Sequence, residues 1–206
     1  MFYQFIRGLV RGCFRLYFRW EVCGSEHLPV TGGALLAANH VSYLDPPLMG
    51  CAVARPVHFM AKRELFNIPI LGWLIRHLNA FPVQQRGADR RALRQAIEML
   101  RSGQVVGIFP EGTRGNGKIL LKPQPGCVLL AAKAQVPIVP MAIVGAENVV
   151  PKGKWFPRPA KIKVFIGEPI HLPVDETRPS REALEEYSQL VMEKIGELRS
   201  HAISGI

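Results

Sequence analysis

Cysteine and histidine are sparse in this sequence, and neither is grouped in a metal-binding pattern. None of the four cysteines belongs to a CxxC pair, and the six histidines form no HExxH or HxxxH arrangement. The sequence therefore predicts no metal site and no disulfide framework, and the scattered thiols suit a reducing compartment. The cysteines are Cys13, Cys23, Cys51 and Cys127.

Acidic residues are also few, because 26 Lys and Arg face only 16 Asp and Glu, which gives a formal net charge of +10. Since 48% of the residues are apolar as well, an anionic surface or substrate is the expected partner. Positive charge would also suit a nucleic-acid binder. No zinc finger, aromatic-interleaved RNA motif or clear recognition helix accompanies it, so we predict no nucleic-acid partner.

The N-terminal segment, residues 1–22, lacks the uninterrupted apolar run of a membrane span or a signal peptide. Arg7, Arg11, Arg15 and Arg19 recur through it at four-residue spacing. A span would carry these charges through hydrocarbon, and a signal peptide concentrates its charges ahead of the apolar region. We predict an amphipathic helix in the plane of an anionic membrane surface, with arginines reaching lipid phosphates. The alternative is a first helix docked on the core of its own domain.

The remaining residues, 23–206, have the length and patterning of a single α/β domain. Short apolar runs alternate with longer helical periods, which predicts a mostly parallel sheet flanked by helices. Strands are expected at 33–39, 56–62, 79–84, 105–108, 136–145 and 160–170, and helices at 46–54, 64–78, 88–103, 126–135 and 180–201.

Two further segments raise the question of lipid contact. The helix at 64–78, interrupted by Pro69, is apolar on most faces, which suits an acyl-chain groove, insertion into lipid or plain core packing. The basic loop at 151–160 carries Trp155 and Phe156. It is expected to be either solvated or a second membrane contact.

The stretch ANHVSYLDPP places His40 directly after the expected strand at 33–39 and Asp45 five residues later. Ligands of open α/β sheets lie beyond the carboxyl ends of the strands. A histidine there can act as a general base if a carboxylate holds its other ring nitrogen. Asp45 also suits the N-cap of the following helix, ahead of Pro46, and the two roles are compatible.

The block FPEGTR follows the strand at 105–108, so parallel topology places it at the same edge as the histidine. Gly112 permits a sharp turn, and Thr113 and Arg114 offer a hydroxyl and a planar guanidinium for phosphate oxygens. Glu111 is expected to hold Arg114 or a substrate hydroxyl. The alternative is a surface turn with a weak, exposed Glu–Arg pair.

These blocks resemble the glycerolipid acyltransferases, in particular the bacterial 1-acylglycerol-3-phosphate acyltransferases. NHVSYLD is similar to their NHxxxxD motif and FPEGTR to their most recognisable block, and the similarity extends over roughly residues 20–172. The resemblance implies transfer of an acyl group from a thioester of coenzyme A or acyl carrier protein to the sn-2 hydroxyl of a lysophospholipid. It also implies action at the cytoplasmic face of the cell membrane, without a further cofactor.

The resemblance implies a catalytic pair and a set of substrate-binding residues. Two departures concern phosphate binding: Gln85 stands where relatives commonly have arginine, and KPQP (122–125) stands where a lysine is frequent. Another acceptor, such as glycerol 3-phosphate, or a non-catalytic membrane-binding module stays as an alternative. The catalytic residues are His40 and Asp45, and the substrate-binding residues are Asn39, Lys62, Arg86, Glu111, Gly112, Thr113, Arg114 and Lys122.

Overall fold

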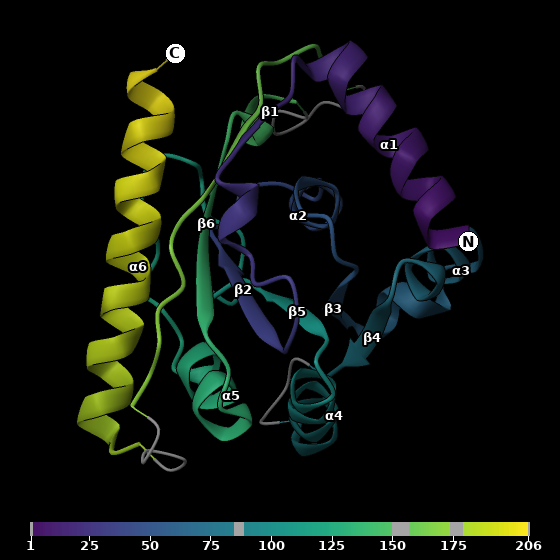
Figure 1. Ribbon diagram of the computed structural model, residues 1–206. Helices are drawn as coiled ribbons and strands as arrows, with labels where there is room; N and C mark the ends of the chain where they lie inside the picture. Colours follow the sequence, from purple (N-terminus) through teal and green to yellow (C-terminus); the bar gives the residue numbers. More distant parts are fainter. Residues whose placement is uncertain (1, 85–88, 150–156, 174–178, 206) are drawn as a thin grey trace.

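A seven-stranded sheet forms the centre of the protein, whose computed structural model describes residues 2–84, 89–149, 157–173 and 179–205 (Figure 1). The strand order is β1-β7-β6-β2-β5-β3-β4, and every neighbouring pair is parallel except β6–β7. The predicted mostly parallel sheet is thus confirmed. The strands are β1 Glu21–Cys23, β2 Ala34–Ala38, β3 Val57–Lys62, β4 Ala80–Val83, β5 Val105–Ile108, β6 Ile138–Val144 and β7 Lys163–Ile166.

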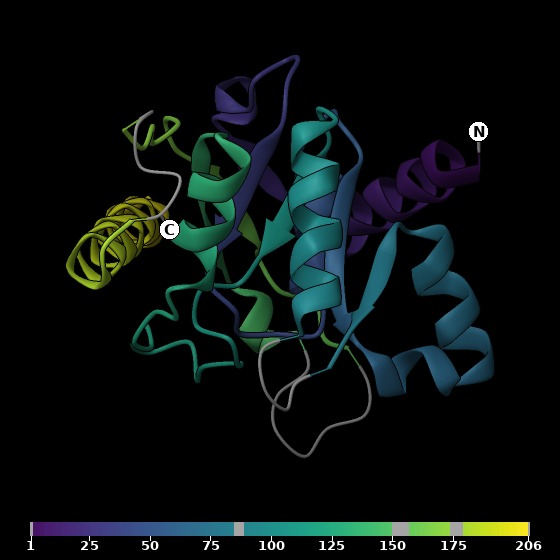
Figure 2. The same cartoon turned by 90° about the horizontal axis from the view of Figure 1, so that it is seen from below.

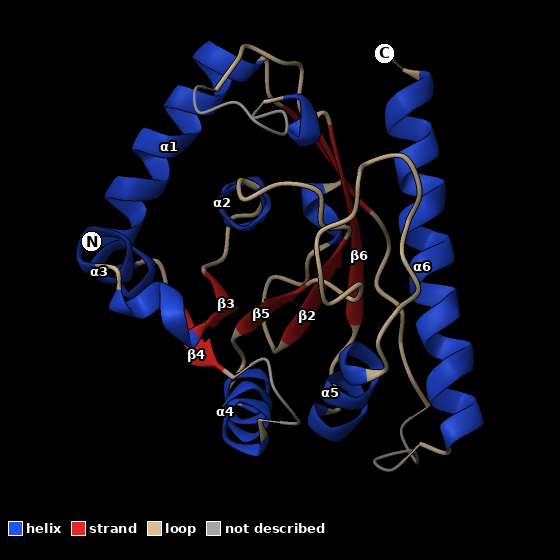
Figure 3. Ribbon diagram, turned by 180° about the vertical axis from the view of Figure 1, so that it is seen from behind, coloured by secondary structure: helices blue, strands red, loops and turns tan. Residues whose placement is uncertain are grey.

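Helices cover both faces of this sheet (Figures 1 and 3). One core lies between the sheet and helices α1 and α2, and the other lies between the sheet and α4, α5 and α6. The central strand β2 is buried along its whole length because its side chains alternate between these two cores. The helices are α1 Phe2–Phe18, α2 Asp45–Ala52, α3 Pro69–His77, α4 Arg90–Arg101, α5 Gly126–Ala134 and α6 Arg181–Ser204, with short 3₁₀ helices at Ser25–His27, Arg63–Asn67 and Ala146–Asn148.

The predicted helix at 64–78 divides at its proline, as the sequence indicated. A 3₁₀ helix over Arg63–Asn67 precedes α3, and Pro69 occupies the first turn of α3, where its missing N–H costs no hydrogen bond. Gly72 then lies against the backbone of the 3₁₀ helix, since a Cβ there would come within 2.3 Å of the Phe66 carbonyl oxygen. The two short helices therefore fold back on each other.

The first helix is shorter than predicted, because α1 ends at Phe18 and Glu21–Cys23 form an edge strand paired with β7. This strand was missed, since three residues carry too little periodicity to be recognised. Between the two elements, Arg19 has a φ of 45°. The left-handed conformation of Arg19 turns the chain from the helix into the sheet.

Helix α1 is docked on the domain through one face. Phe14 and Phe18 are buried in the same core as the sheet, and Arg7 Nη1 donates hydrogen bonds to the carbonyl oxygens of Val53 (3.2 Å) and Ala54 (2.5 Å) after α2. For this face of α1, the alternative prediction of a first helix docked on the core of its own domain is therefore right. The expectation that the arginines reach lipid phosphates is wrong for Arg7, because the helix rotation that buries the phenylalanines also turns Arg7 toward the domain.

The structure offers no membrane span: among the described residues, no helix combines the length and the apolar character needed to cross a bilayer.

Candidate active site

The two sequence blocks meet at one edge of the sheet, as predicted. Strands β2 and β5 are parallel neighbours, with Ala37 paired to Ile108. His40 and Glu111 each follow these paired residues by three positions. They therefore emerge side by side beyond the carboxyl ends of the two strands, where α/β proteins bind ligands.

His40 and Asp45 form a hydrogen-bonded pair, with 2.7 Å between His40 Nδ1 and Asp45 Oδ2. The same oxygen accepts from the backbone N–H of Val41 (2.6 Å) and of Ser42 (2.7 Å), and the Asp45 side chain is fully buried. Because a carboxylate only accepts, Nδ1 carries a proton, and in the neutral ring the lone pair is therefore on Nε2. The imidazole is thus oriented and polarised as a base.

The prediction that Asp45 is the N-cap of the following helix is wrong. Asp45 is the first residue of α2, Leu44 occupies the cap position, and no side chain caps the helix. An N-cap at Asp45 would need donors at Pro47 and Leu48. Proline has no N–H, and the Leu48 N–H already donates to the Leu44 carbonyl at 2.9 Å. The carboxylate therefore turns back to the loop that carries the histidine.

The loop that follows β5 holds His40 through its ring and its main chain. The imidazole stacks on Phe109, with 4.1 Å between ring centroids and 17° between planes. The backbone N–H of His40 donates to Glu111 Oε1 at 2.9 Å, and the backbone N–H of Gly115 donates to the His40 carbonyl at 2.8 Å. Segments 71 residues apart thus form one rigid unit around the imidazole.

Glu111 does not hold Arg114, so the role predicted for it is wrong. The carboxylate is 4% exposed, and it accepts one backbone N–H at each oxygen, from His40 at Oε1 and from Leu121 at Oε2, each at 2.9 Å. A buried carboxylate requires such donors, and its burial leaves little room for a substrate hydroxyl to reach either oxygen. Glu111 instead fastens the histidine loop to the chain leading into α5.

Asn39 does not face a substrate either, contrary to the role that the resemblance implied. The side chain is fully buried, its Nδ2 donates to the Ile143 carbonyl at 2.9 Å, and its Oδ1 accepts from the Ile143 N–H at 2.7 Å. The β2–β6 register ends at Ala38 and Met141. The amide therefore prolongs the strand pairing by one residue and supports the main chain just before His40.

Gly112, Thr113 and Arg114 lie exposed beside the histidine loop. Gly112 has a φ of 67°, and its N–H donates to the Phe109 carbonyl at 3.0 Å, which closes the expected turn. Arg114 Nη2 donates to the Tyr43 hydroxyl at 2.9 Å, and its Cζ lies 3.6 Å from the centroid of that ring. The structure therefore brings a guanidinium to the loop that joins His40 and Asp45.

The other predicted cations are not gathered around the histidine in the same way. Lys62 is exposed at the end of β3. Lys122 Nζ lies 3.7 Å from a Glu185 oxygen on α6, a pair in which both side chains are mostly exposed and which contributes little. Arg86 lies outside the described residues, as do Trp155 and Phe156. Among the described cations, only Arg114 is tied to the histidine loop by a side-chain contact.

Sequence reasoning overlooked the contacts of Phe109 and Tyr43, although both lie inside the recognised blocks. Their ring contacts with His40 and Arg114 depend on the pairing of β2 with β5. A single sequence shows only their positions within the motifs. The only hint of these contacts in the sequence was therefore the aromatic character of the two residues.

The Ser42 hydroxyl and the buried thiols lack the features of activated nucleophiles. Ser42 is buried, and its Oγ accepts from the Leu44 N–H at 3.3 Å. Burial raises the pKa of the Cys51 thiol to about 11 and that of the Cys127 thiol to about 12, so both stay protonated near neutral pH. Direct attack by a substrate oxygen therefore suits this site better than a covalent enzyme intermediate.

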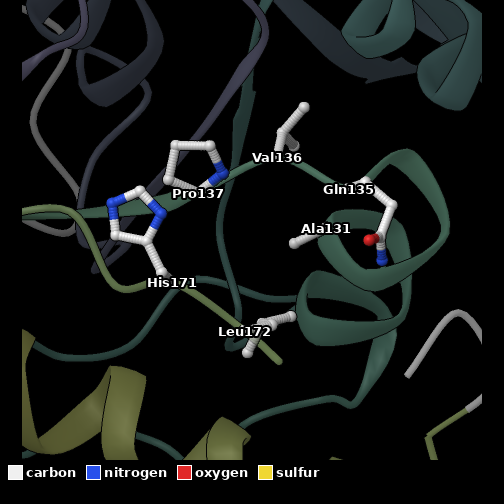
Figure 4. Close-up of a pocket in the computed structure, with 6 residues that line it drawn as sticks. All are labelled: Ala131, Gln135, Val136, Pro137, His171 and Leu172. Carbon is white, nitrogen blue, oxygen red and sulfur yellow. The ribbon is translucent and has the colours of Figure 1, made fainter. Parts of the chain in front are cut away.

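A separate hollow opens at the opposite edge of the sheet (Figure 4). It lies where α5 leads into the amino end of β6. Since β2 and β6 are parallel, this end of the sheet is remote from His40, and the hollow is distinct from the candidate active site. Its lining residues are Ala131, Gln135, Val136, Pro137, His171 and Leu172.

Comparison with known proteins matches both the sequence and the fold. The family model described as Acyltransferase matches residues 19–144. The chain is 31% identical over 199 residues to a 1-acyl-sn-glycerol-3-phosphate acyltransferase of Bacillus subtilis, covering 96% of this chain and 97% of that protein. It is also 32% identical to the Streptococcus pneumoniae protein of the same description, over 70% of this chain and 55% of that one.

A solved structure agrees with these matches. The crystal structure of the 1-acyl-sn-glycerophosphate (LPA) acyltransferase, PlsC, from Thermotoga maritima is similar with a TM-score of 0.75 and 33% identity. The similarity covers 96% of this chain and 81% of that chain. The similarity therefore extends over nearly the whole α/β fold.

Proposed function

The chain belongs to the acyltransferase family, among the 1-acyl-sn-glycerol-3-phosphate acyltransferases, and from this premise we propose that it converts 1-acylglycerol 3-phosphate to phosphatidic acid. The observation that carries the proposal is the joint placement of His40, Asp45 and Arg114 by two interlocked loops. A base and a phosphate-binding group close to one another suit an acceptor that carries both a hydroxyl and a phosphate. The acyl donor is a thioester of coenzyme A or acyl carrier protein.

In the proposed reaction, Nε2 of His40 removes the proton of the sn-2 hydroxyl as its oxygen attacks the thioester carbonyl carbon. The tetrahedral intermediate then collapses, the carbon–sulfur bond breaks, and the thiolate takes the proton from the imidazolium. The products are an ester and a free thiol. Asp45 stabilises the imidazolium through the 2.7 Å hydrogen bond at Nδ1. No further cofactor enters this scheme.

The direct test is a turnover assay on purified, detergent-solubilised protein. Lysophosphatidic acid, glycerol 3-phosphate and monoacylglycerol are each offered with acyl coenzyme A and with acyl carrier protein. Phosphatidic acid should form fastest from lysophosphatidic acid. Preference for glycerol 3-phosphate would move the activity to another acceptor, and absence of transfer from either donor would favour a non-catalytic membrane-binding module.

Replacement of Arg114 with alanine should raise the apparent KM for lysophosphatidic acid by about 10-fold to 100-fold, because hydrogen bonds to a charged group contribute roughly 1.5–3 kcal/mol. The kcat should change much less, since the guanidinium binds the phosphate before and during transfer. Steady-state kinetics measure both quantities. Arg181→Ala, an exposed arginine at the start of α6, is the matched control. An unchanged KM in the Arg114 variant would show that the phosphate binds elsewhere.

A second part of the proposal is attachment to the cell membrane, at its cytoplasmic face, and helix α1 supports the attachment itself. The face of α1 that points away from the domain is apolar: Phe5, Leu9 and Leu16 are 70%, 58% and 91% exposed. In water, such a face stays exposed to solvent, which is unfavourable. At a bilayer surface it is buried among acyl chains. Arg15 and Arg19 are also exposed and can reach lipid phosphates.

Helix α3 lies on the same side of the molecule as α1 (Figures 1 and 2). Ile70 and Trp73 on it are 84% and 51% exposed. Plain core packing therefore does not account for the apolar character of this helix. In the proposal, both helices contact lipid and bring the lysophospholipid to the active site.

The double replacement Leu9→Asp with Leu16→Asp should reduce binding to anionic lipid vesicles by more than about 10-fold, since burial of each leucine contributes roughly 1.5–3 kcal/mol. Vesicle flotation measures the bound fraction. Val30→Asp is the matched control, because Val30 is 87% exposed but lies near the amino end of β2. If the double variant floated as well as the unaltered protein, α1 would not be the lipid-binding element.

A further inference from the structure

Tyr43 occupies an unusual position between the two catalytic residues. It lies in the loop that joins His40 to Asp45, and its side chain is 75% exposed, so burial gives it little stabilisation. Its ring nevertheless faces the Arg114 guanidinium at 3.6 Å, and its hydroxyl accepts from Nη2 at 2.9 Å. Its contacts with the arginine are thus the interactions that place this ring.

From this geometry we propose that Tyr43 is a positioning residue that holds the Arg114 guanidinium at the mouth of the site and thereby sets the affinity for the acceptor phosphate. The inference rests on the proposed function. It adds a residue that touches neither the reacting atoms nor the phosphate. Tyr43 acts on the substrate through the arginine.

Both ends of the contact are anchored to the catalytic unit. On one side, Asp45 Oδ2 accepts from the N–H groups of Val41 and Ser42, which fixes the start of the tyrosine loop. On the other side, the Gly115 N–H donates to the His40 carbonyl, which fixes the main chain next to the arginine. The ring therefore holds the guanidinium in a constant position relative to the imidazole.

The contact also leaves the arginine able to bind an anion. The ring covers one face of the planar guanidinium, and one of its five N–H donors is directed to the tyrosine hydroxyl. The remaining donors lie along the edge, where phosphate oxygens bind. A phosphate can therefore bind without displacing Tyr43, and an arginine already held in place loses less conformational freedom on binding.

The test is a set of Tyr43 variants assayed with lysophosphatidic acid and with monoacylglycerol, which lacks the phosphate. Tyr43→Ala should raise the KM for lysophosphatidic acid by about 5-fold to 10-fold, within the range of an exposed cation–π contact combined with lost preorganisation. The kcat should stay within about twofold, and the rate with monoacylglycerol should not change. Tyr43→Phe should keep most of the affinity that Tyr43→Ala loses, whereas Tyr43→Leu, similar in bulk but without a π face, should not.

A double-mutant cycle isolates the route through the arginine. In an Arg114→Ala background, Tyr43→Ala should cause no further rise in KM. Independent effects of the two replacements, rescue by leucine, or an unchanged KM in Tyr43→Ala would each overturn the inference. If Arg114→Ala raises the KM and Tyr43→Ala does not, only the inference fails. If the unaltered protein does not distinguish lysophosphatidic acid from monoacylglycerol, the proposed function itself fails.

Discussion

Replacement of His40 with alanine should abolish most acyl transfer, with an expected fall in kcat of about 10³-fold to 10⁴-fold, at the upper end of what a general base contributes. The imidazole is the only group in the described site that combines a lone pair with a buried carboxylate behind it. Without it, the acceptor hydroxyl must lose its proton to water. Steady-state kinetics with lysophosphatidic acid and an acyl thioester measure the loss.

The matched control is His171→Ala, the same chemical change at the opposite edge of the sheet (Figure 4). It should leave kcat within about twofold of the unaltered protein, because surface changes away from the site have small effects. Thermal unfolding distinguishes lost chemistry from lost structure. A folded His40→Ala protein with more than a tenth of the original kcat would remove this histidine from the reaction.

Replacement of Asp45 with asparagine should lower kcat by about 10²-fold to 10³-fold, a loss of roughly 3–4 kcal/mol of transition-state stabilisation. Asp45 Oδ2 accepts from three donors, whereas Oδ1 has no partner among the described residues. Asparagine should therefore keep its oxygen at the first position and place its amide nitrogen at the second. The hydrogen bond to His40 persists, and only the negative charge that stabilises the imidazolium is lost.

The buried amide nitrogen should lower the free energy of unfolding by about 1–3 kcal/mol, the cost of an unsatisfied polar group. Asp45→Ala removes all three hydrogen bonds and should lower both stability and kcat further. Chemical denaturation and steady-state kinetics measure the two effects separately. An Asp45→Asn protein with the original kcat would show that the carboxylate charge has no part in the reaction.

Most of the fold follows from local patterns in the sequence. The predicted strands at 33–39 and 105–108 were found at Ala34–Ala38 and Val105–Ile108, because a buried parallel strand is a continuous apolar run bounded by turn residues. Pro69 divides the predicted helix at 64–78 because proline has no N–H to donate inside a helix and is therefore tolerated only in its first turn. The edge strand Glu21–Cys23 was missed, since its pairing with β7 depends on residues far along the chain.

The proposed catalytic pair likewise followed in part from local spacing and in part from tertiary contacts. His40 and Asp45 are five residues apart, so a short loop was sufficient to predict their contact. The sequence predicted that the Asp45 carboxylate would cap the following helix, and this was wrong. Pro47 has no N–H, and the Leu48 N–H already donates to the Leu44 carbonyl. The carboxylate instead accepts hydrogen bonds from the backbone N–H groups of Val41 and Ser42.

The sequence by itself determined which chemical groups stand at this edge of the sheet: a histidine with its carboxylate, and a glycine turn followed by an arginine. Only the tertiary structure decided which groups those side chains meet. Glu111 lies against the His40 N–H rather than Arg114, Asn39 against Ile143, and Arg114 against Tyr43. Local spacing fixes which residues follow a strand, whereas the parallel pairing of β2 with β5 and β6 determines which loops become neighbours. Burial then requires each enclosed polar group to find a partner among those neighbours.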